Sequence, residues 1–199
     1  MPSWRSGGAN GIGAACGEVM KARGWSVLVA DKDTSAAAAT AAQLGGKSFT
    51  LDVLDIDAMQ ALAHEIDRDI GPIAALVVSS AIFQGAVPLE ETPPDLFDQL
   101  MAVNVRGTYH ANRIFGLAMA KRGAGAIVNL ASVTGQGSTP LNIYGPGKAA
   151  IINMTKSFAG EFGSRGVRVN SVSPGVTLTP RIRERKATGS RYPADLDDR

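Results

Sequence analysis

The sequence is poor in the residues that several common kinds of protein depend on. It has one cysteine, Cys16, and two histidines, so an internal disulfide is excluded and we expect no metal centre. The lone cysteine agrees with a reducing compartment, which predicts a cytoplasmic protein. No apolar run reaches the ~18 residues of a membrane span, so we expect no membrane insertion. A net charge of +2 is too small to predict nucleic-acid binding.

Apolar runs and glycines are plentiful instead. Of 199 residues 45% are hydrophobic and 23 are glycine, which is typical of one globular domain with many tight turns. Runs typical of buried strands alternate with helical patterns and lie at 26–30, 48–51, 73–78, 126–130 and 167–172. This alternation predicts an α/β fold, a three-layer, doubly wound parallel sheet in a single domain. We assign residues 1–180 to that domain and expect 181–199 to be a charged, disordered tail.

A glycine-rich turn opens the chain at residues 6–13, SGGANGIG. Gly7, Gly11 and Gly13 would let backbone N–H groups approach a pyrophosphate, and Ile12 would begin the following helix. The positive end of that helix favours a negatively charged group. The turn therefore predicts a dinucleotide site, with a plain flexible loop as the alternative.

Asp31 ends the apolar run at 26–30 and lies 18 residues after Gly13, since 31 − 13 = 18. A carboxylate about 20 residues after such a turn accepts hydrogen bonds from the adenosine ribose. The same carboxylate repels a 2′-phosphate, so we expect NAD in preference to NADP. Lys32 is the counter-argument, because its ammonium would attract that phosphate.

Ser132, Tyr144 and Lys148 lie in a second glycine-rich stretch, residues 129–148. Tyr144 and Lys148 are four residues apart, so on a helix they share one face. A nearby ammonium favours the phenolate, so we expect the pKa of Tyr144 to be lowered. Such a phenol can move a proton to or from a carbonyl or alcohol oxygen, to which Ser132 would hydrogen-bond.

In combination these motifs resemble the short-chain dehydrogenase/reductase family, from Ser6 to Pro180. The resemblance implies a Rossmann-like fold and an oxidoreductase that transfers a hydride between NAD and a small alcohol or ketone. It implies that Ser132 orients the substrate oxygen and that Tyr144 transfers the proton. It also implies that Lys148 lowers the pKa of the tyrosine and holds the nicotinamide ribose.

The resemblance extends to further residues. Asn104, in Asn-Val-Arg-Gly, would hold a water that links Lys148 to solvent. Helices at 95–121 and 145–163 would form a homodimer or homotetramer. Further cofactor contacts are implied for Asp52, Val53, Ala81, Val176 and Thr179.

The chain departs from the family pattern in three places. Residues 1–5 read MPSWR where the family has an apolar first strand, Val78-Ser79-Ser80-Ala81 replaces Asn-Asn-Ala-Gly, and few residues follow Pro180. We therefore expect the first and last strands to be missing and the fold to be marginally stable. The alternative function is a truncated, catalytically impaired remnant that at most binds nucleotide. Nucleic-acid binding through the arginines after Pro180 is not expected.

Overall fold

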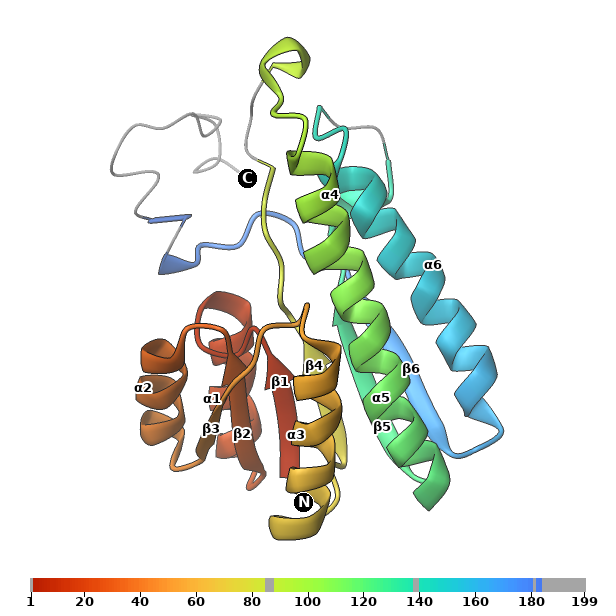
Figure 1. The fold of residues 1–199 in the computed structure, drawn as a ribbon. Coiled ribbons are helices and arrows are strands. Elements are labelled where there is room, and N and C mark those ends of the chain that lie inside the picture. The colour runs from red at the N-terminus through yellow and green to blue at the C-terminus, as the bar shows by residue number, and fades with distance from the viewer. Residues whose placement is uncertain (1, 85–87, 138–139, 181, 184–199) are drawn as a thin grey trace.

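The computed structural model describes residues 2–84, 88–137, 140–180 and 182–183, and for residues 2–6 it describes the backbone alone. One sheet runs through these residues in the order β3-β2-β1-β4-β5-β6, and every neighbouring pair is parallel (Figure 1). The strands are β1 (Pro2–Ser6), β2 (Ser26–Asp31), β3 (Lys47–Thr50), β4 (Ala75–Val78), β5 (Gly125–Leu130) and β6 (Val167–Val172).

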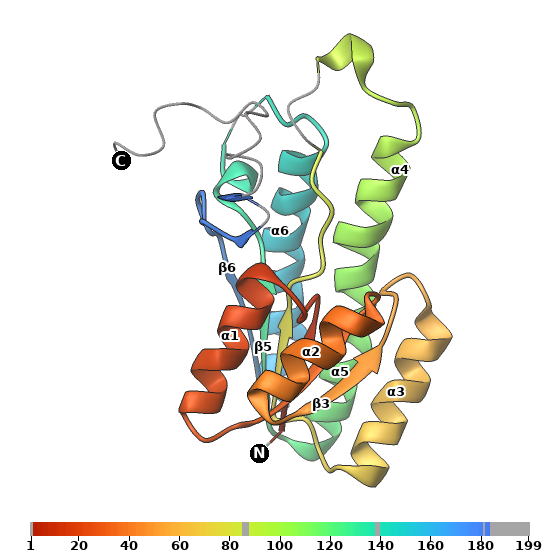
Figure 2. The same ribbon diagram turned by 90° about the vertical axis from the view of Figure 1, so that its left-hand side faces the viewer.

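Helices cover both faces of this sheet. Helices α1 (Gly11–Ala22) and α2 (Thr34–Leu44) lie on one side, and α3 (Ile56–Asp69), α5 (Gly107–Arg122) and α6 (Tyr144–Gly163) on the other. Figure 2 shows α1 and α3 on opposite sides. In β2, Val27 and Val29 pack in the α2 layer while Leu28 and Ala30 pack in the α3 and α5 layer. The three-layer, doubly wound α/β fold is thus confirmed, since successive strand side chains face opposite layers.

The expectation that the first strand is missing is wrong. β1 pairs with β2 through Pro2–Ser6 and with β4 through Ser3–Ser6, in the centre of the sheet. Strand pairing is made by backbone N–H and C=O groups, so a segment without an apolar pattern can still complete a ladder. Pro2 stands at the first strand position, where proline is tolerated. The backbone edges of β2 and β4 are therefore paired, which removes our reason to expect marginal stability.

The sheet is less covered towards β6. Val128 and Leu130 are half-buried, and Val172 is 52% exposed. No strand follows β6 within the described residues. The tail that we expect at 181–199 lies outside the described residues except for Ile182 and Arg183.

A long helical rod carries Asn104. It consists of α4 (Leu96–Leu100), a π-helical segment η2 (Met101–Arg106) and α5, which follow one another without a break (Figure 1). We expect a regular helix over 95–121, and the π segment is the departure from it. No described helix is long and apolar enough to cross a membrane.

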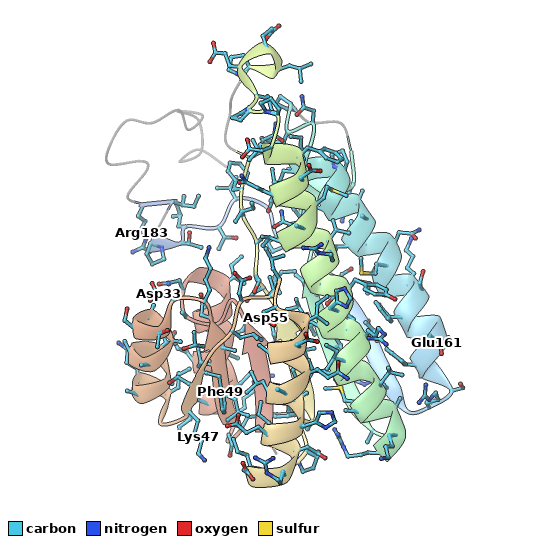
Figure 3. All side chains as sticks on the ribbon, viewed as in Figure 1. Asp33, Lys47, Phe49, Asp55, Glu161 and Arg183 are labelled. Atoms are coloured by element: carbon cyan, nitrogen blue, oxygen red, sulfur yellow. The ribbon has the colours of Figure 1, made fainter. Side chains whose placement is uncertain are left out.

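Of the first three helices, two begin with an aspartate cap and one does not. Asp33 accepts a hydrogen bond from the N–H of Ala36, and Asp55 from that of Ala58, which satisfies donors at the starts of α2 and α3. Figure 3 shows both aspartates at these helix ends. Asn10, before α1, makes no such side-chain cap. The residue before α1 thus does not cap this helix with its side chain.

Candidate active site

Two cavities lie at the carboxyl ends of the strands. The larger holds about 390 Å³ and the smaller about 280 Å³. The two cavities are neighbours, because they share four lining residues: Asn10, Ser79, Ala81 and Ile82. These residues form the wall between the cavities. Both cavities lie where β1 adjoins β4 and the strand order reverses, which is where open α/β sheets bind ligands.

The structure brings most of the predicted site residues to these cavities. The smaller cavity is lined by Gly7, Asp31, Asp52, Val53 and Ala81. The larger is lined by Ile12, Gly13, Ala81, Ser132, Tyr144, Lys148, Val176 and Thr179. Two predicted residues, Gly11 and Asn104, line neither. Gly11 has φ +56° and lies against Thr179, whose methyl carbon would be 3.3 Å from a Cβ at position 11.

Ser132 follows β5 and caps the short 3-10 helix η3 (Val133–Gly135). Its Oγ accepts a hydrogen bond from the Thr134 N–H at 3.2 Å and another from the Thr134 hydroxyl at 2.9 Å. A hydroxyl has one donor and two acceptor positions. Both acceptor positions are occupied, so the hydroxyl of Ser132 keeps its proton for donation to a further group. Thr134, which sequence reasoning missed, sets this orientation.

Lys148 is held beneath Tyr144 on the first turns of α6. Its Nζ donates to the carbonyl oxygen of Leu130 at 2.7 Å and lies 5.4 Å from the centre of the Tyr144 ring. Lys148 is 3% exposed, and burial lowers its pKa to about 8. The two side chains share a helix face as predicted, because the residues are one turn apart.

The expected direction of the tyrosine pKa is wrong for this structure. Burial raises the pKa of Tyr144 above its usual value. The cause is desolvation, which disfavours the phenolate. At neutral pH the phenol therefore keeps its proton.

Asn104 is 1% exposed and its side chain binds backbone. Its Oδ1 accepts the Ile82 N–H and its Nδ2 donates to the Ile82 carbonyl oxygen, both at 2.9 Å. Ile82 belongs to the wall between the cavities. The side chain of Asn104 thus fixes this wall, while the water that we expect it to hold stays a prediction.

The glycine turn is packed against the end of β4. Gly7 has φ +71°, and a Cβ there would lie 2.6 Å from the Ser80 nitrogen, so a larger residue would clash. The Ser79 hydroxyl donates to the Gly7 carbonyl oxygen at 2.9 Å. Serine therefore ties β4 to the turn after β1, at a place where the sequence lacks the family's asparagines.

Asp31 closes the other side of the turn. One carboxylate oxygen accepts from the Ala9 N–H at 3.2 Å and the other from the Asp33 N–H at 3.2 Å. Lys32 is exposed and lines the same cavity as Asp31. The residues present fit a dinucleotide: an uncapped helix start, a glycine turn and a carboxylate lie along one continuous edge.

A buried polar network supports the site and was not predicted. The Asn112 and Asn129 side chains exchange two hydrogen bonds, at 2.7 and 3.0 Å, and Asn129 also donates to Thr155 at 3.1 Å. An asparagine inside a buried apolar strand is the sequence signal for such a network. The network joins β5 to α5 and α6 next to the Leu130 carbonyl. Among the described residues no group of His, Cys, Asp or Glu is placed to hold a metal.

The chain is similar to known proteins over most of its length. A family model described as enoyl-(acyl carrier protein) reductase matches residues 7–195. The D-threitol dehydrogenase of Mycolicibacterium smegmatis is 36% identical over 180 residues, which cover 87% of this chain and 69% of that protein.

Solved structures agree with this likeness. One from Brucella melitensis 16M, named ribose-5-phosphate isomerase, has a TM-score of 0.94 and 40% identity, covering 99% of this chain and 76% of that one. NAD+-bound xylitol dehydrogenase has a TM-score of 0.87 and 27% identity, covering 93% of this chain and 74% of that one. With the fold, the glycine turn and the serine, tyrosine and lysine in one cavity, these matches show that the chain belongs to the short-chain dehydrogenase/reductase family.

Proposed function

We propose that this oxidoreductase interconverts a secondary alcohol and its ketone with NAD as the cofactor. The observation that carries the proposal is that Ser132, Tyr144 and Lys148 line one cavity together with Gly13 of the glycine turn. The nicotinamide cofactor supplies hydride transfer when it is bound. The chain itself must bind the cofactor, orient the substrate oxygen and move its proton.

Each of the three residues has a distinct part in handling that oxygen. Ser132 donates a hydrogen bond to it, because both of its acceptor positions are used by Thr134. Tyr144 gives the proton to the ketone oxygen, or takes it from the alcohol in the reverse direction. The ammonium of Lys148 stabilises the phenolate that remains and binds the nicotinamide ribose. Asn104 contributes by holding the wall at Ile82.

The choice of NAD rests on Asp31. Its carboxylate lines the smaller cavity with Asp52 and Val53, which we assign to the adenosine half of the cofactor. A carboxylate at this position binds ribose hydroxyls and repels a 2′-phosphate. Lys32 lies beside the cavity but is exposed to solvent, which weakens its attraction.

A small polyol or diol is the substrate class that we propose. Similar proteins are named for threitol and xylitol. The single cysteine supports a reducing compartment, so we place the protein in the cytoplasm.

Self-association through α4, α5 and α6 also belongs to the proposal. Phe97 is 53% exposed and Tyr109 43%, and a hollow beside Tyr109 is lined by Met101, Val105 and Met154. Apolar side chains in such numbers on one face are typical of an interface between subunits. We propose a homodimer or homotetramer that covers this face.

The test combines binding and turnover with the purified protein. Calorimetry should show that NAD binds, and xylitol or D-threitol should produce NADH absorbance, whereas Tyr144→Phe should bind NAD without producing it. Binding without turnover in the unmodified chain would favour the alternative of a nucleotide-binding remnant. Isomerisation of ribose 5-phosphate without added NAD would refute the proposal in favour of an isomerase.

A further inference from the structure

Gln84 is a buried glutamine that no sequence motif indicates. It is 5% exposed and lies in the segment after β4. Its Oε1 accepts hydrogen bonds from the N–H groups of Ile143 at 3.0 Å and Tyr144 at 3.1 Å. Its Nε2 donates to the Asn142 side-chain oxygen at 2.7 Å. All three partners lie at the start of the helix that carries the catalytic residues.

These bonds replace a cap that α6 does not have. Ile143, the residue before the helix, makes no side-chain cap, and an isoleucine cannot accept a hydrogen bond. The first N–H groups of a helix have no partner within it, and buried ones must find one elsewhere. Gln84 supplies that partner from 59 and 60 residues away in sequence. The backbone of Tyr144 is thereby fixed by another part of the chain.

The segment 82–84 holds Tyr144 by its ring as well. The Phe83 ring meets the Tyr144 ring edge to face, with centroids 5.0 Å apart and planes at 70°. The preceding residue, Ile82, is held by both side-chain polar atoms of Asn104. Segment 82–84 thus contacts both the backbone and the ring of Tyr144. The same segment is held by Asn104 in the π-helical turn.

We infer that Gln84 is a positioning residue, which sets the place of the Tyr144 phenol relative to Ser132 and Lys148 by capping α6. Gln84 lines neither cavity, so it acts through the backbone of Tyr144 and has no contact with the substrate or cofactor positions. The inference rests on the proposed role of Tyr144 in proton transfer. A misplacement of about 1 Å at a catalytic group can lower the rate ~10²-fold.

The variants separate position from general stability. Gln84→Met keeps the length of the side chain and removes both polar atoms, whereas Gln84→Glu keeps an acceptor for the two N–H groups. Arg122→Leu is the control. Arg122 donates to the Ile73 carbonyl just before β4, at the amino ends of the strands and away from the two site cavities. Each variant and the unmodified protein are labelled with 3-fluorotyrosine, so that fluorine NMR reports the surroundings of each tyrosine ring. The resonance that is lost in Tyr144→Phe is assigned to Tyr144.

The expected result is a shifted or broadened Tyr144 resonance and at least tenfold faster amide exchange at Ile143 and Tyr144 in Gln84→Met. Its kcat with xylitol or D-threitol should fall 10- to 100-fold while the Kd for NAD stays within about twofold. Gln84→Glu loses only the bond to Asn142, so it should shift the resonance less than Gln84→Met and keep most of kcat, and Arg122→Leu should change neither. If the unmodified protein has no turnover, the proposed function fails, and the fluorine and exchange data still test the positioning role.

Three results would overturn the inference. The first is an unchanged Tyr144 resonance and kcat in Gln84→Met. The second is a parallel loss of kcat and NAD binding in Gln84→Met. The third is a loss of kcat in Arg122→Leu equal to that in Gln84→Met. If Gln84→Met does not fold, Asn142→Ala takes its place, because Asn142 is exposed and its loss releases only the Nε2 of Gln84. That variant should shift the Tyr144 resonance in the same way by a smaller amount, and no shift would refute the positioning role.

Discussion

The side-chain amide of Asn104 reproduces a backbone strand pairing with Ile82: it accepts from the N–H and donates to the C=O of the same residue, both at 2.9 Å. Asparagine suits this purpose because its amide carries an acceptor and a donor side by side. The bond pair connects the π-helical segment to the segment that adjoins both cavities and Tyr144.

Replacing Asn104 with leucine should therefore destabilise the protein. Two backbone groups of Ile82 lose their partner, and an unpaired buried group costs about 1–3 kcal/mol. We expect the free energy of unfolding in urea to fall by about 2–4 kcal/mol and turnover to fall with it. A loss below about 1 kcal/mol would show that water replaces the amide at little expense.

Tyr144→Phe should abolish most turnover and leave NAD binding nearly intact, because the phenol acts on the proton. Removal of a general acid or base typically lowers the rate ~10²–10⁴-fold. Tyr109→Phe is the matched control, since Tyr109 is 43% exposed on α5 and lines neither site cavity. Steady-state kcat and calorimetric Kd measure the two effects. A phenylalanine variant with near-normal kcat would remove Tyr144 from the proposed mechanism.

Asp31→Asn and Asp31→Ser should both reduce the preference for NAD over NADP. The two variants differ in how much they disturb the structure. Asparagine retains an acceptor for the Ala9 N–H but loses the charge, whereas serine shortens the side chain as well. Both should improve NADP binding relative to NAD, measured as the ratio of kcat/KM for the two cofactors. Preference for NADP in the unmodified protein would show that Lys32 governs the choice.

Lys148→Met should stabilise the folded protein at neutral pH while it abolishes turnover. Burial lowers the pKa of Lys148 from 10.5 to about 8, so keeping the ammonium buried costs about 3 kcal/mol. This cost applies fully below about pH 8, where the folded protein holds the proton, and disappears by pH 10.5, where neither state holds it. Urea unfolding should show the gain at pH 7 and its decline between these two values. A variant that is less stable at pH 7 would show that the bond to Leu130 outweighs the desolvation.

The sequence alone was enough to predict most of the residues that line the two cavities. It gave little indication of the residues that hold them in place. Five residues that line the two cavities were predictable because their types and spacings form recognisable motifs: Gly13, Asp31, Ser132, Tyr144 and Lys148. Residues that hold these in place follow no fixed spacing. The bond from Gln84 to Tyr144 joins segments that only the fold brings together, so no local pattern reports it.

The prediction of a missing first strand failed for a related reason. Pattern reading detects strands by the alternation or clustering of apolar side chains, and Pro2–Ser6 has neither. The backbone of that segment nevertheless fills the gap between β2 and β4. The pKa of Tyr144 was misjudged because a sequence shows that a lysine is near but not how far water is excluded.

The π-helical turn at Met101–Arg106 makes chain length, as well as residue type, a condition of the site. A π turn is closed by i→i+5 bonds and so holds one residue more than an α turn. Deleting one of the residues that follow Asn104 in this segment would let the turn close as regular α-helix and would displace Asn104 along and around the helix relative to α5. Asn104 would then no longer meet Ile82, and the segment beside Tyr144 would lose its anchor without a single unfavourable substitution.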